Sequence, residues 1–254
     1  MTDANSNPLA GKVALVSGGG QNIGRAIALG LAADGATVLV NGRGNVVAIE
    51  AVAAEINDAG GRAMAHLADV SDEGAVREMI ARLVNEAGGI DIVVSNAGLR
   101  RQTPFMEMSF TEWREILSVA LDGAFLLARH AAPHMKARGG GAIIGMSGVS
   151  NHAGTRERAH VNASKAGLEG LVRGLAVELA ADNITVNAIA PGAIDTVRGA
   201  AAGVLPPGMA KTIPLGRRGT VDEIAAMVRH LVGPDGGYIT GQCIHINGGI
   251  YLGH

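Results

Sequence analysis

The 254-residue chain is poor in several features that mark particular classes of protein. Its single cysteine, Cys243, excludes an internal disulfide and a cysteine-cluster metal site. Aromatic residues make up only 2% of the chain, too few for a base-stacking surface, and the net charge of −2 gives no basic footprint for nucleic acid. No apolar run approaches the ~20 residues that span a bilayer, and residues 1–10 lack the segments of a secretory signal. These absences predict a cytoplasmic globular protein with no membrane or nucleic-acid partner.

What the chain does contain is a regular alternation of strand-like and helix-like segments. Hydrophobic residues reach 48%, enough for a sizeable core, and no linker or repeat divides the chain. Nearly continuous apolar runs that alternate with helical periodicity indicate a parallel sheet covered on both faces. The expected strands are Lys12–Val16, Thr37–Val40, Ala63–Leu67, Ile90–Ser95, Ala142–Met146, Thr185–Ala190 and Cys243–Ile246. The fold class is therefore α/β: one doubly wound Rossmann domain over residues 1–254, with a seven-stranded, mainly parallel sheet and a flexible N-terminus at residues 1–10.

Several residues mark where helices begin and bend. Ile23–Ala33 has helical apolar periodicity, and a long helix from Thr111 to Arg138 is expected to kink at Pro133. Capping boxes (Ser109 with Glu112, Thr220 with Glu223) and the Ser71-Asp72-Glu73 run indicate further helix starts. The proline-rich segment Thr196–Gly219 lacks periodicity and follows a strand end, where a substrate lid is commonly found; a passive connection is the alternative.

The first strand leads into a glycine-rich turn, Ser17-Gly18-Gly19-Gly20-Gln21-Asn22-Ile23-Gly24, and then into a helix. Glycines at such a place let the backbone approach a pyrophosphate, whose charge meets the helix N-terminus. A glycine cluster between a strand and a helix is much more specific than a lone one. The pattern predicts a dinucleotide-binding site, although a tight structural turn would have similar glycines.

Five motifs, in order along nearly the whole chain, resemble those of the short-chain dehydrogenase/reductase family. They are the glycine turn, Asp69-Val70, Ser95-Asn96-Ala97-Gly98, Pro191-Gly192-Ala193-Ile194-Asp195-Thr196, and Thr240-Gly241-Gln242 with Asn247-Gly248-Gly249. Asn22 stands in place of the middle glycine of the family's turn. The resemblance implies a nicotinamide cofactor bound by Ser17, Gly18, Gln21, Asn22, Ile23, Gly24, Arg43, Asp69, Val70, Asn96, Ala97, Gly98, Lys165, Pro191, Gly192, Ile194 and Thr196. It also implies a homodimer or homotetramer.

The end of the second strand bears on the choice between NADP and NAD. NAD-specific Rossmann sites place an acid there, against the ribose 2′-hydroxyl. By the family's spacing Gly42 takes that position, and Arg43 follows, with a guanidinium suited to a 2′-phosphate. The sequence favours NADP(H), unless Arg43 is simply a solvated loop residue.

The catalytic pattern of the family is incomplete in this chain. The family uses Tyr-x-x-x-Lys, a serine thirteen residues before the tyrosine, and an upstream asparagine. Lys165 is retained, but the other three positions hold Val161, Gly148 and Ala120. Neither tyrosine of the chain lies nearby in the sequence, and loss of a general acid and an oxyanion donor would each cost ~10²-fold or more in rate.

Three residues are candidate replacements for the missing acid. His160 directly precedes Val161, and imidazole titrates near neutral pH. Ser150 shares strand parity with Gly148, and His152 lies in the same loop. The alternative for each is an ordinary polar residue.

Four arginines are expected around the crevice mouth. Arg100 and Arg101 follow the Asn96-Ala97-Gly98 motif, and Arg156 and Arg158 precede Lys165. Together they suggest an anionic substrate, if they are not solvated side chains. His130 and His134 have a metal-ligand spacing but lack acidic neighbours between them, so no metal site is predicted.

The leading function is an NADP(H)-dependent oxidoreductase acting on a small carbonyl or alcohol, with Lys165 and a replacement acid. Two alternatives remain open. One is a non-redox enzyme, such as a lyase, on the same fold. The other is a catalytically silent NADP(H)-binding sensor or partner subunit.

Overall fold

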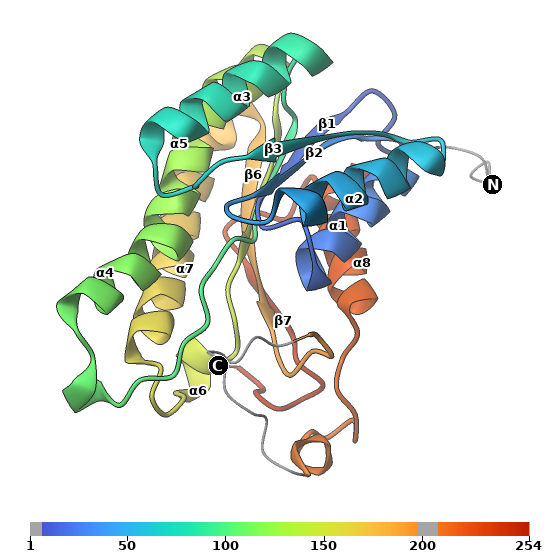
Figure 1. Ribbon diagram of the computed structural model, residues 1–254. Coiled ribbons are helices and arrows are strands. Elements are labelled where there is room, and N and C mark those ends of the chain that lie inside the picture. The colour runs from blue at the N-terminus through green and yellow to red at the C-terminus, as the bar shows by residue number, and fades with distance from the viewer. Residues whose placement is uncertain (1–6, 198–207, 254) are drawn as a thin grey trace.

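A seven-stranded, all-parallel sheet forms the centre of the computed structural model, which describes residues 7–197 and 208–253 (Figure 1). Within that part of the chain the strand order is β3-β2-β1-β4-β5-β6-β7. The strands are β1 (Val13–Val16), β2 (Thr37–Gly42), β3 (Arg62–Leu67), β4 (Ile92–Ser95), β5 (Gly141–Met146), β6 (Ile184–Pro191) and β7 (Cys243–Ile246). The order reverses direction between β1 and β4, which is the switch point where ligands bind in such sheets. The predicted doubly wound α/β fold is confirmed.

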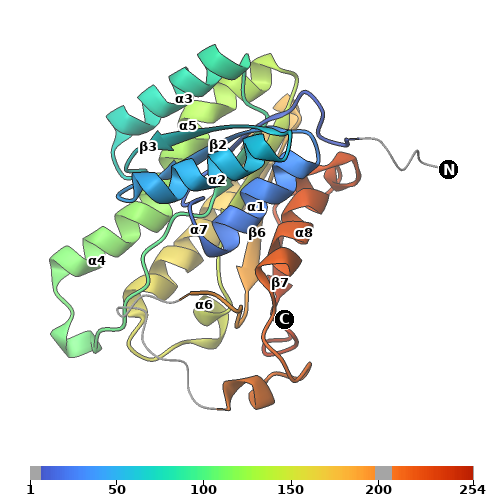
Figure 2. The same cartoon turned by 45° about the vertical axis from the view of Figure 1, so that its right-hand side comes forward.

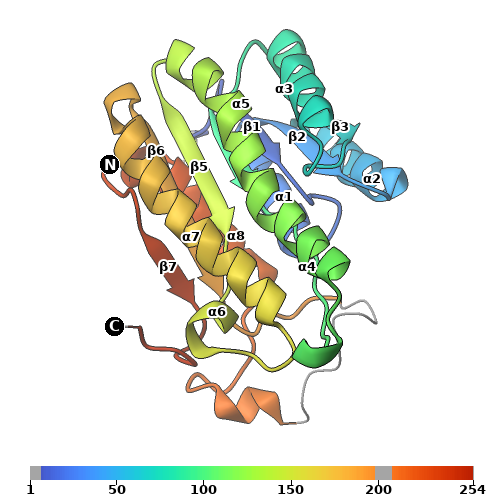
Figure 3. The same cartoon turned by 90° about the vertical axis from the view of Figure 1, so that its left-hand side faces the viewer.

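Helices cover both faces of the sheet. They are α1 (Asn22–Ala33), α2 (Val46–Asp58), α3 (Glu73–Ala87), α4 (Phe110–Leu117), α5 (Gly123–Ala137), α6 (Ser150–Ala153), α7 (Ala159–Leu179) and α8 (Val221–Val232). Figure 2 brings the layer of α1, α2 and α8 forward, and Figure 3 shows α4, α5 and α7 on the opposite face.

The core follows from the alternation of side chains along each strand. On β1, Ala14 and Val16 belong to the apolar cluster beneath α1, α2 and α8, whereas Val13 and Leu15 belong to the cluster beneath α3, α5 and α7. Because both faces of the central strands are buried, these strands are mostly apolar, with a few buried polar residues such as Asn41 and Asn187. For this reason the strands could be recognised in the sequence as nearly continuous apolar runs.

The predicted helix starts are confirmed at α3, α4 and α8, and the structure shows how each is capped. Thr220 and Glu223 form the complete capping box expected at α8. Ser109 accepts a hydrogen bond from the Glu112 backbone, but the Glu112 carboxylate turns away to other partners, so the box at α4 is only half formed. At α3 the cap is Asp72 rather than Ser71, whose N–H and hydroxyl both donate to Asp69.

The long helix is irregular at a place that the sequence did not indicate. A π-helical turn, Ser118–Asp122, separates α4 from α5, and α5 continues through Pro133 to Ala137. By length and hydropathy alone the continuous stretch Phe110–Ala137 would be able to cross a membrane. Half of its apolar window is buried within the protein, however, as in a core helix.

The structure describes parts of the predicted flexible N-terminus and of the predicted lid. Leu9 is only 1% exposed, and its N–H donates to the Asp34 carbonyl, so the expected flexibility over residues 1–10 does not extend to this residue. Of the predicted lid, residues 198–207 lie outside the described part of the chain. Its flanks are held by a parallel bridge between Ile194 and Gly219.

Candidate active site

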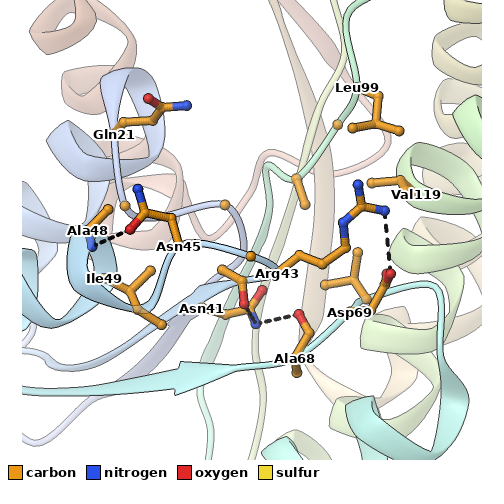
Figure 4. Close-up of a pocket in the computed structure, with 17 residues that line it drawn as sticks. Gln21, Asn41, Arg43, Asn45, Ala48, Ile49, Ala68, Asp69, Leu99 and Val119 are labelled. Carbon is orange, nitrogen blue, oxygen red and sulfur yellow. Dashed lines mark hydrogen bonds and ion pairs between the residues drawn. The ribbon is translucent and has the colours of Figure 1, made fainter.

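A pocket of about 290 Å³ opens at the carboxyl ends of β1, β2 and β4 (Figure 4). It is lined by Gly18, Gly20, Gln21, Asn41, Gly42, Arg43, Gly44, Asn45, Ala48, Ile49, Ala68, Asp69, Val70, Ala97, Gly98, Leu99 and Val119. Seven of the predicted cofactor-binding residues are among them: Gly18, Gln21, Arg43, Asp69, Val70, Ala97 and Gly98. The elements expected to bind a dinucleotide therefore converge on one cavity.

At two glycines of the turn, a side chain would cause backbone strain or a steric collision. Gly18 has φ +62°, a left-handed conformation that favours glycine. A Cβ on Gly24 would lie 2.2 Å from the Gly18 carbonyl oxygen and 2.6 Å from the Asn96 amide nitrogen. The start of α1 can therefore pack against the turn only when residue 24 has no side chain.

Hydrogen bonds from the segment that follows β4 fix the shape of the turn. The Ser17 hydroxyl accepts from the backbone N–H groups of Asn96 and Ala97 at 2.9 and 3.1 Å. In return, the Asn96 amide donates to the Ser17 and Gly18 carbonyls, both at 3.0 Å. These bonds position the turn from within the protein. Ser17 and Asn96 thus shape the pocket without being among the residues that line it, and their predicted contact with the cofactor stays a prediction.

Asn22, which replaces a family glycine, takes over the backbone conformation that a glycine would supply. Its φ is +50°, and asparagine tolerates the left-handed region better than most residues. Its amide also forms two hydrogen bonds with the Val197 backbone, donating to the carbonyl at 3.0 Å and accepting from the N–H at 2.9 Å. Asn22 consequently joins the glycine turn to the start of the predicted lid segment.

Arg43 extends along the pocket from the end of β2 toward Asp69 (Figure 4). Its guanidinium lies 3.4 Å from the Asp69 carboxylate, and both groups are partly exposed. Burial raises the pKa of Asp69, but hydrogen bonds from Ser71 and the charge of Arg43 outweigh it, so the net shift is downward. At Gly42 a Cβ would lie 2.8 Å from the buried Ile49 side chain, so an acid there would require Ile49 to move.

Lys165 is a half-buried cation next to the Asn96-Ala97-Gly98 motif. Its ammonium donates to the Met146 carbonyl at the end of β5, with an Nζ–O distance of 2.5 Å. A Cβ at Gly98 would lie 3.6 Å from Nζ, so the two groups are neighbours. Burial, followed by the charge of Arg100, lowers the pKa of Lys165 to about 8.

The three positions to which the resemblance assigns catalytic side chains hold Val161, Ala120 and Gly148. Val161 stands one helical turn before Lys165 on α7 and is 7% exposed. Ala120 is buried within the π-helical turn, and such turns are frequent at functional sites. A Cβ at Gly148 would meet only the Ser150 hydroxyl within 4 Å, at 3.9 Å, among the described atoms. The framework has room for the serine.

His160 lies in the interior, apart from the pocket lining. Its side chain is fully buried, with Nε2 3.1 Å from the Glu112 carboxylate and Nδ1 accepting from the Val161 N–H at 3.0 Å. Both ring nitrogens are therefore engaged, Nε2 in joining α7 to α4 and Nδ1 within α7 itself. This geometry gives His160 a structural role and argues against the proton-donor role expected from sequence.

Ser150 and His152 both lie on the short helix α6, which follows β5. Ser150 is the nearest group to the open space beside Gly148. His152 points elsewhere: its Nε2 lies 2.9 Å from the Glu169 carboxylate and 4.0 Å from the Cys243 sulfur. Burial, followed by the charge of Glu169, raises the pKa of the Cys243 thiol to about 12.

The four mouth arginines have different surroundings. Arg101 forms a 2.6 Å ion pair with Glu115, which neutralises its charge. Arg156 is 94% exposed and lies 3.9 Å from the Glu157 carboxylate. Arg100 is close enough to Lys165 to lower its pKa, and Arg158 precedes α7 as its N-cap. The arrangement leaves Arg100 as the arginine most closely associated with the site.

A polar atom on the other side of the crevice supports a nicotinamide at this place. The Thr196 hydroxyl is buried and has no hydrogen-bond partner among the described residues. Buried hydroxyls are usually satisfied, so one that is not invites a ligand. Ile194 is buried beside it, and Gly192 packs so closely on Asn247 that a Cβ would lie 2.7 Å away. Pro191 ends β6 and completes this loop.

Some lining residues escaped the sequence reasoning. Asn45 caps α2 by accepting from the Ala48 N–H, and Leu99 and Val119 supply apolar walls. The capping asparagine before an apolar helix was a signal that could have been used for Asn45. Val119 had no comparable signal, because its position depends on the π-helical turn.

Comparisons with known proteins agree with this geometry. Residues 18–251 match the family described as Enoyl-(Acyl carrier protein) reductase. The chain is 41% identical over 242 residues to a 3-oxoacyl-[acyl-carrier-protein] reductase of Staphylococcus aureus, covering 95% of this chain and 98% of the relative. A similar reductase of Aquifex aeolicus is 38% identical over 245 residues, covering 96% and 98%.

Solved structures give the same result. A dehydrogenase/reductase from Sinorhizobium meliloti superposes with a TM-score of 0.89 at 35% identity, covering 97% of this chain and 98% of that one. A short-chain dehydrogenase/reductase from Serratia marcescens superposes with a TM-score of 0.88 at 35% identity, covering 96% and 99%.

Proposed function

The chain belongs to the short-chain dehydrogenase/reductase family, and from that premise we propose that it is an NADP(H)-dependent oxidoreductase in which Lys165 supplies the proton to a small carbonyl substrate. The observation that carries the proposal is the state of Lys165. It is a half-buried amine at the carboxyl end of β5 with a pKa of about 8, beside the motif that lines the cofactor pocket.

The residues present fit the cofactor. The glycine turn and the N-terminus of α1 would hold the pyrophosphate, Asp69 and Val70 the adenine, and Thr196 with Ile194 the carboxamide. Arg43 would turn from Asp69 toward a 2′-phosphate, a better partner because it presents more charge and more acceptor oxygens. When bound, the nicotinamide supplies the hydride.

Lys165 is suited to act without the family's tyrosine. A general acid works best when its pKa lies near the working pH, and an ordinary lysine is a poor one because its pKa is about 10.4. Burial and Arg100 bring Lys165 into the useful range. Its hydrogen bond to the Met146 carbonyl fixes the position of Nζ, so a proton on the same nitrogen remains to be given to a substrate oxygen.

The curated relatives suggest where to begin with substrates. Their names specify 3-oxoacyl groups on acyl carrier protein, so a 3-oxoacyl thioester is the first carbonyl compound to test. Arg100 would favour an anionic group near the reacting carbon. The competing function is a silent NADP(H)-binding subunit, which is favoured by the apolar Val161 and by Gly148 at the two positions that normally supply hydroxyls.

The test is NADPH oxidation by the purified full-length chain with a 3-oxoacyl thioester and a panel of small ketones. Calorimetry with NADPH runs in parallel. We expect NADPH binding and slow turnover that requires Lys165. Binding without turnover on any carbonyl would favour the silent subunit, and absence of binding would reject the proposal.

An oligomer is part of the same proposal. Two large apolar side chains on the long helices, Phe110 and Phe125, are exposed. Exposed apolar surface of this kind commonly marks an interface. We expect a dimer or tetramer through α4 and α5, which light scattering would measure; a monomer at micromolar concentration would contradict it.

A further inference from the structure

A second cluster of reactive side chains lies at the β7 edge of the sheet, apart from the residues that line the cofactor pocket. His152 on α6 approaches Cys243 and His245 on β7, and one ligand atom from each lies within 4.8 Å of those of the other two. Figure 3 shows α6 beside the end of β7. All three residues are half-buried, so the cluster is formed but accessible to an ion.

The sheet makes space for this cluster. Cys243 and His245 are two residues apart on one strand, so both side chains project on the α7 face. On the neighbouring strand β6, Ala188 is opposite Cys243 and Ala190 is opposite His245. These two methyl side chains leave room above the sheet that larger residues would fill.

One nitrogen in the cluster lacks a partner. Nδ1 of His245 is buried and accepts or donates no hydrogen bond within the described part of the chain. The ring is held in place by packing, with its centroid 4.5 Å from that of His152 and 5.1 Å from that of Tyr251. A buried ring nitrogen that is oriented but unsatisfied indicates a missing binding partner.

We propose that His152, Cys243 and His245 bind a zinc ion, with the Glu169 carboxylate as the fourth ligand. Two imidazoles, one thiolate and one carboxylate are ligand types that zinc accepts in tetrahedral sites. The Glu169 carboxylate lies 2.9 Å from Nε2 of His152 and therefore adjoins the cluster. Because zinc ligands stand ~2.0–2.3 Å from the ion, small side-chain rotations would close the present spacing.

Neighbouring donors would orient the fourth ligand. The Ser147 hydroxyl and the Asn151 amide both donate to the Glu169 carboxylate, the latter at 3.0 Å. Such hydrogen bonds to a ligating carboxylate commonly tune metal affinity. The thiol of Cys243 would bind as the thiolate, so its proton leaves for solvent when the ion enters.

An ion at this place would join three segments that are distant in the sequence. It would fasten α6, which begins two residues after Gly148, to the edge strand and to α7. Zinc binding at this site requires neither bound cofactor nor turnover. Its test is therefore independent of the test of the proposed reductase activity.

The experiment uses the purified full-length chain, stripped with a chelator and dialysed. Zinc chloride is titrated calorimetrically, and bound metal is measured by mass spectrometry. We expect one zinc per chain. We expect Cys243→Ala and His245→Ala each to weaken binding at least tenfold, which corresponds to ~1.4 kcal/mol. The matched control is His134→Ala, on α5 outside the cluster, which should bind zinc like the native chain.

Cobalt gives a second, independent readout. With Co²⁺ in place of zinc, the native chain should show a thiolate-to-cobalt charge-transfer band that Cys243→Ala lacks. Circular dichroism melting of the stripped variants establishes that they are folded. Zinc content far below one per chain, binding unchanged in Cys243→Ala, or binding lost in His134→Ala would each overturn the proposal.

Discussion

Two regions of the crevice differ in how far they have the backbone shape and the side chains of the family's motifs. The glycine-loop region, Ser17–Arg43 with Asn96, keeps both its backbone shape and the side chains that maintain it. The proposed proton-transfer region, Met146–Lys165 with Ala120, has Lys165, and it has Gly148 and Val161 at the positions to which the resemblance assigns hydroxyl groups. The comparison teaches that the two tasks depend on different parts of a residue. Phosphate binding relies mainly on backbone N–H groups, whereas proton transfer needs a particular side chain.

The largest effect should come from the one retained group of the proton-transfer region. Lys165→Met should lower the turnover number by ~10²-fold or more, because it removes the proposed acid. In the native chain the reduction rate should be level below pH 8 and fall about tenfold per pH unit above it, since Lys165 loses its proton near a pKa of about 8.

Stopped-flow NADPH oxidation from pH 6 to pH 10 would measure both. Lys136→Met is the control, since Lys136 is an exposed lysine paired with Asp182. A rate that rises through pH 8, or full turnover by Lys165→Met, would remove Lys165 from the proton-transfer role.

The next effect tests the glycine-loop region. Gly24→Ala should weaken NADPH binding by about 100-fold, ~2.7 kcal/mol, because the new methyl would collide with the Gly18 carbonyl, a backbone atom that cannot turn aside. Gly170→Ala, on α7, is the matched control: no described atom lies within 4 Å of its Cβ, and the change should stabilise the helix by about 0.5–1 kcal/mol. Calorimetry and thermal melting measure the pair. Equal NADPH affinities would show that the turn is not rigid.

A gain-of-function variant tests whether hydroxyl groups are what the proton-transfer region lacks. Gly148→Ser with Val161→Tyr should raise NADPH-dependent ketone reduction by about 30-fold, since a tyrosine hydroxyl beside the Lys165 charge has its pKa lowered toward the working range. Adding Ala120→Asn should increase the gain. Val161→Phe with Gly148→Ser fills the same space without the hydroxyl and serves as control. If the phenylalanine variant gained as much, packing rather than proton transfer would be responsible.

The smallest effect concerns cofactor choice. Calorimetric titration should show NADPH binding at least tenfold more tightly than NADH, a difference of ~1.4 kcal/mol. Arg43→Ala should remove most of that gap by weakening NADPH, because the guanidinium lies in the pocket beside Asp69. Arg156→Ala changes an exposed arginine and should leave both affinities unaltered. Tighter NADH binding by the native chain would contradict the NADP assignment.

The strands and the glycine turn were predictable because their causes are local. A buried parallel strand is apolar at most positions, and the turn needs glycine at Gly18 and Gly24 whatever the rest of the chain does. The complete capping box at Thr220 was predictable for the same reason. In each case the residues that decide the geometry stand within a few positions of one another.

The role of His160 was not predictable, because it depends on a contact between two helices. Nothing near His160 in the sequence shows that Glu112, 48 positions earlier, will meet its ring. The cluster of His152, Cys243 and His245 escaped for a similar reason, since the tertiary fold alone brings α6 to β7. The π-helical turn escaped because Ser118–Asp122 has ordinary helix-forming composition.

That π-helical turn has a consequence for how the long helix can be altered. A π turn holds about one more residue than an α turn would, and its wider bend absorbs that residue. Removing one residue between Ser118 and Asp122 and closing the turn as an α turn would therefore leave the faces of α4 and α5 where they are, so Glu112 would still meet His160. Removing one residue from a regular turn of α4 would instead rotate the preceding part of the helix by about 100°. The π turn is thus a place where this helix can lose a residue without turning either face.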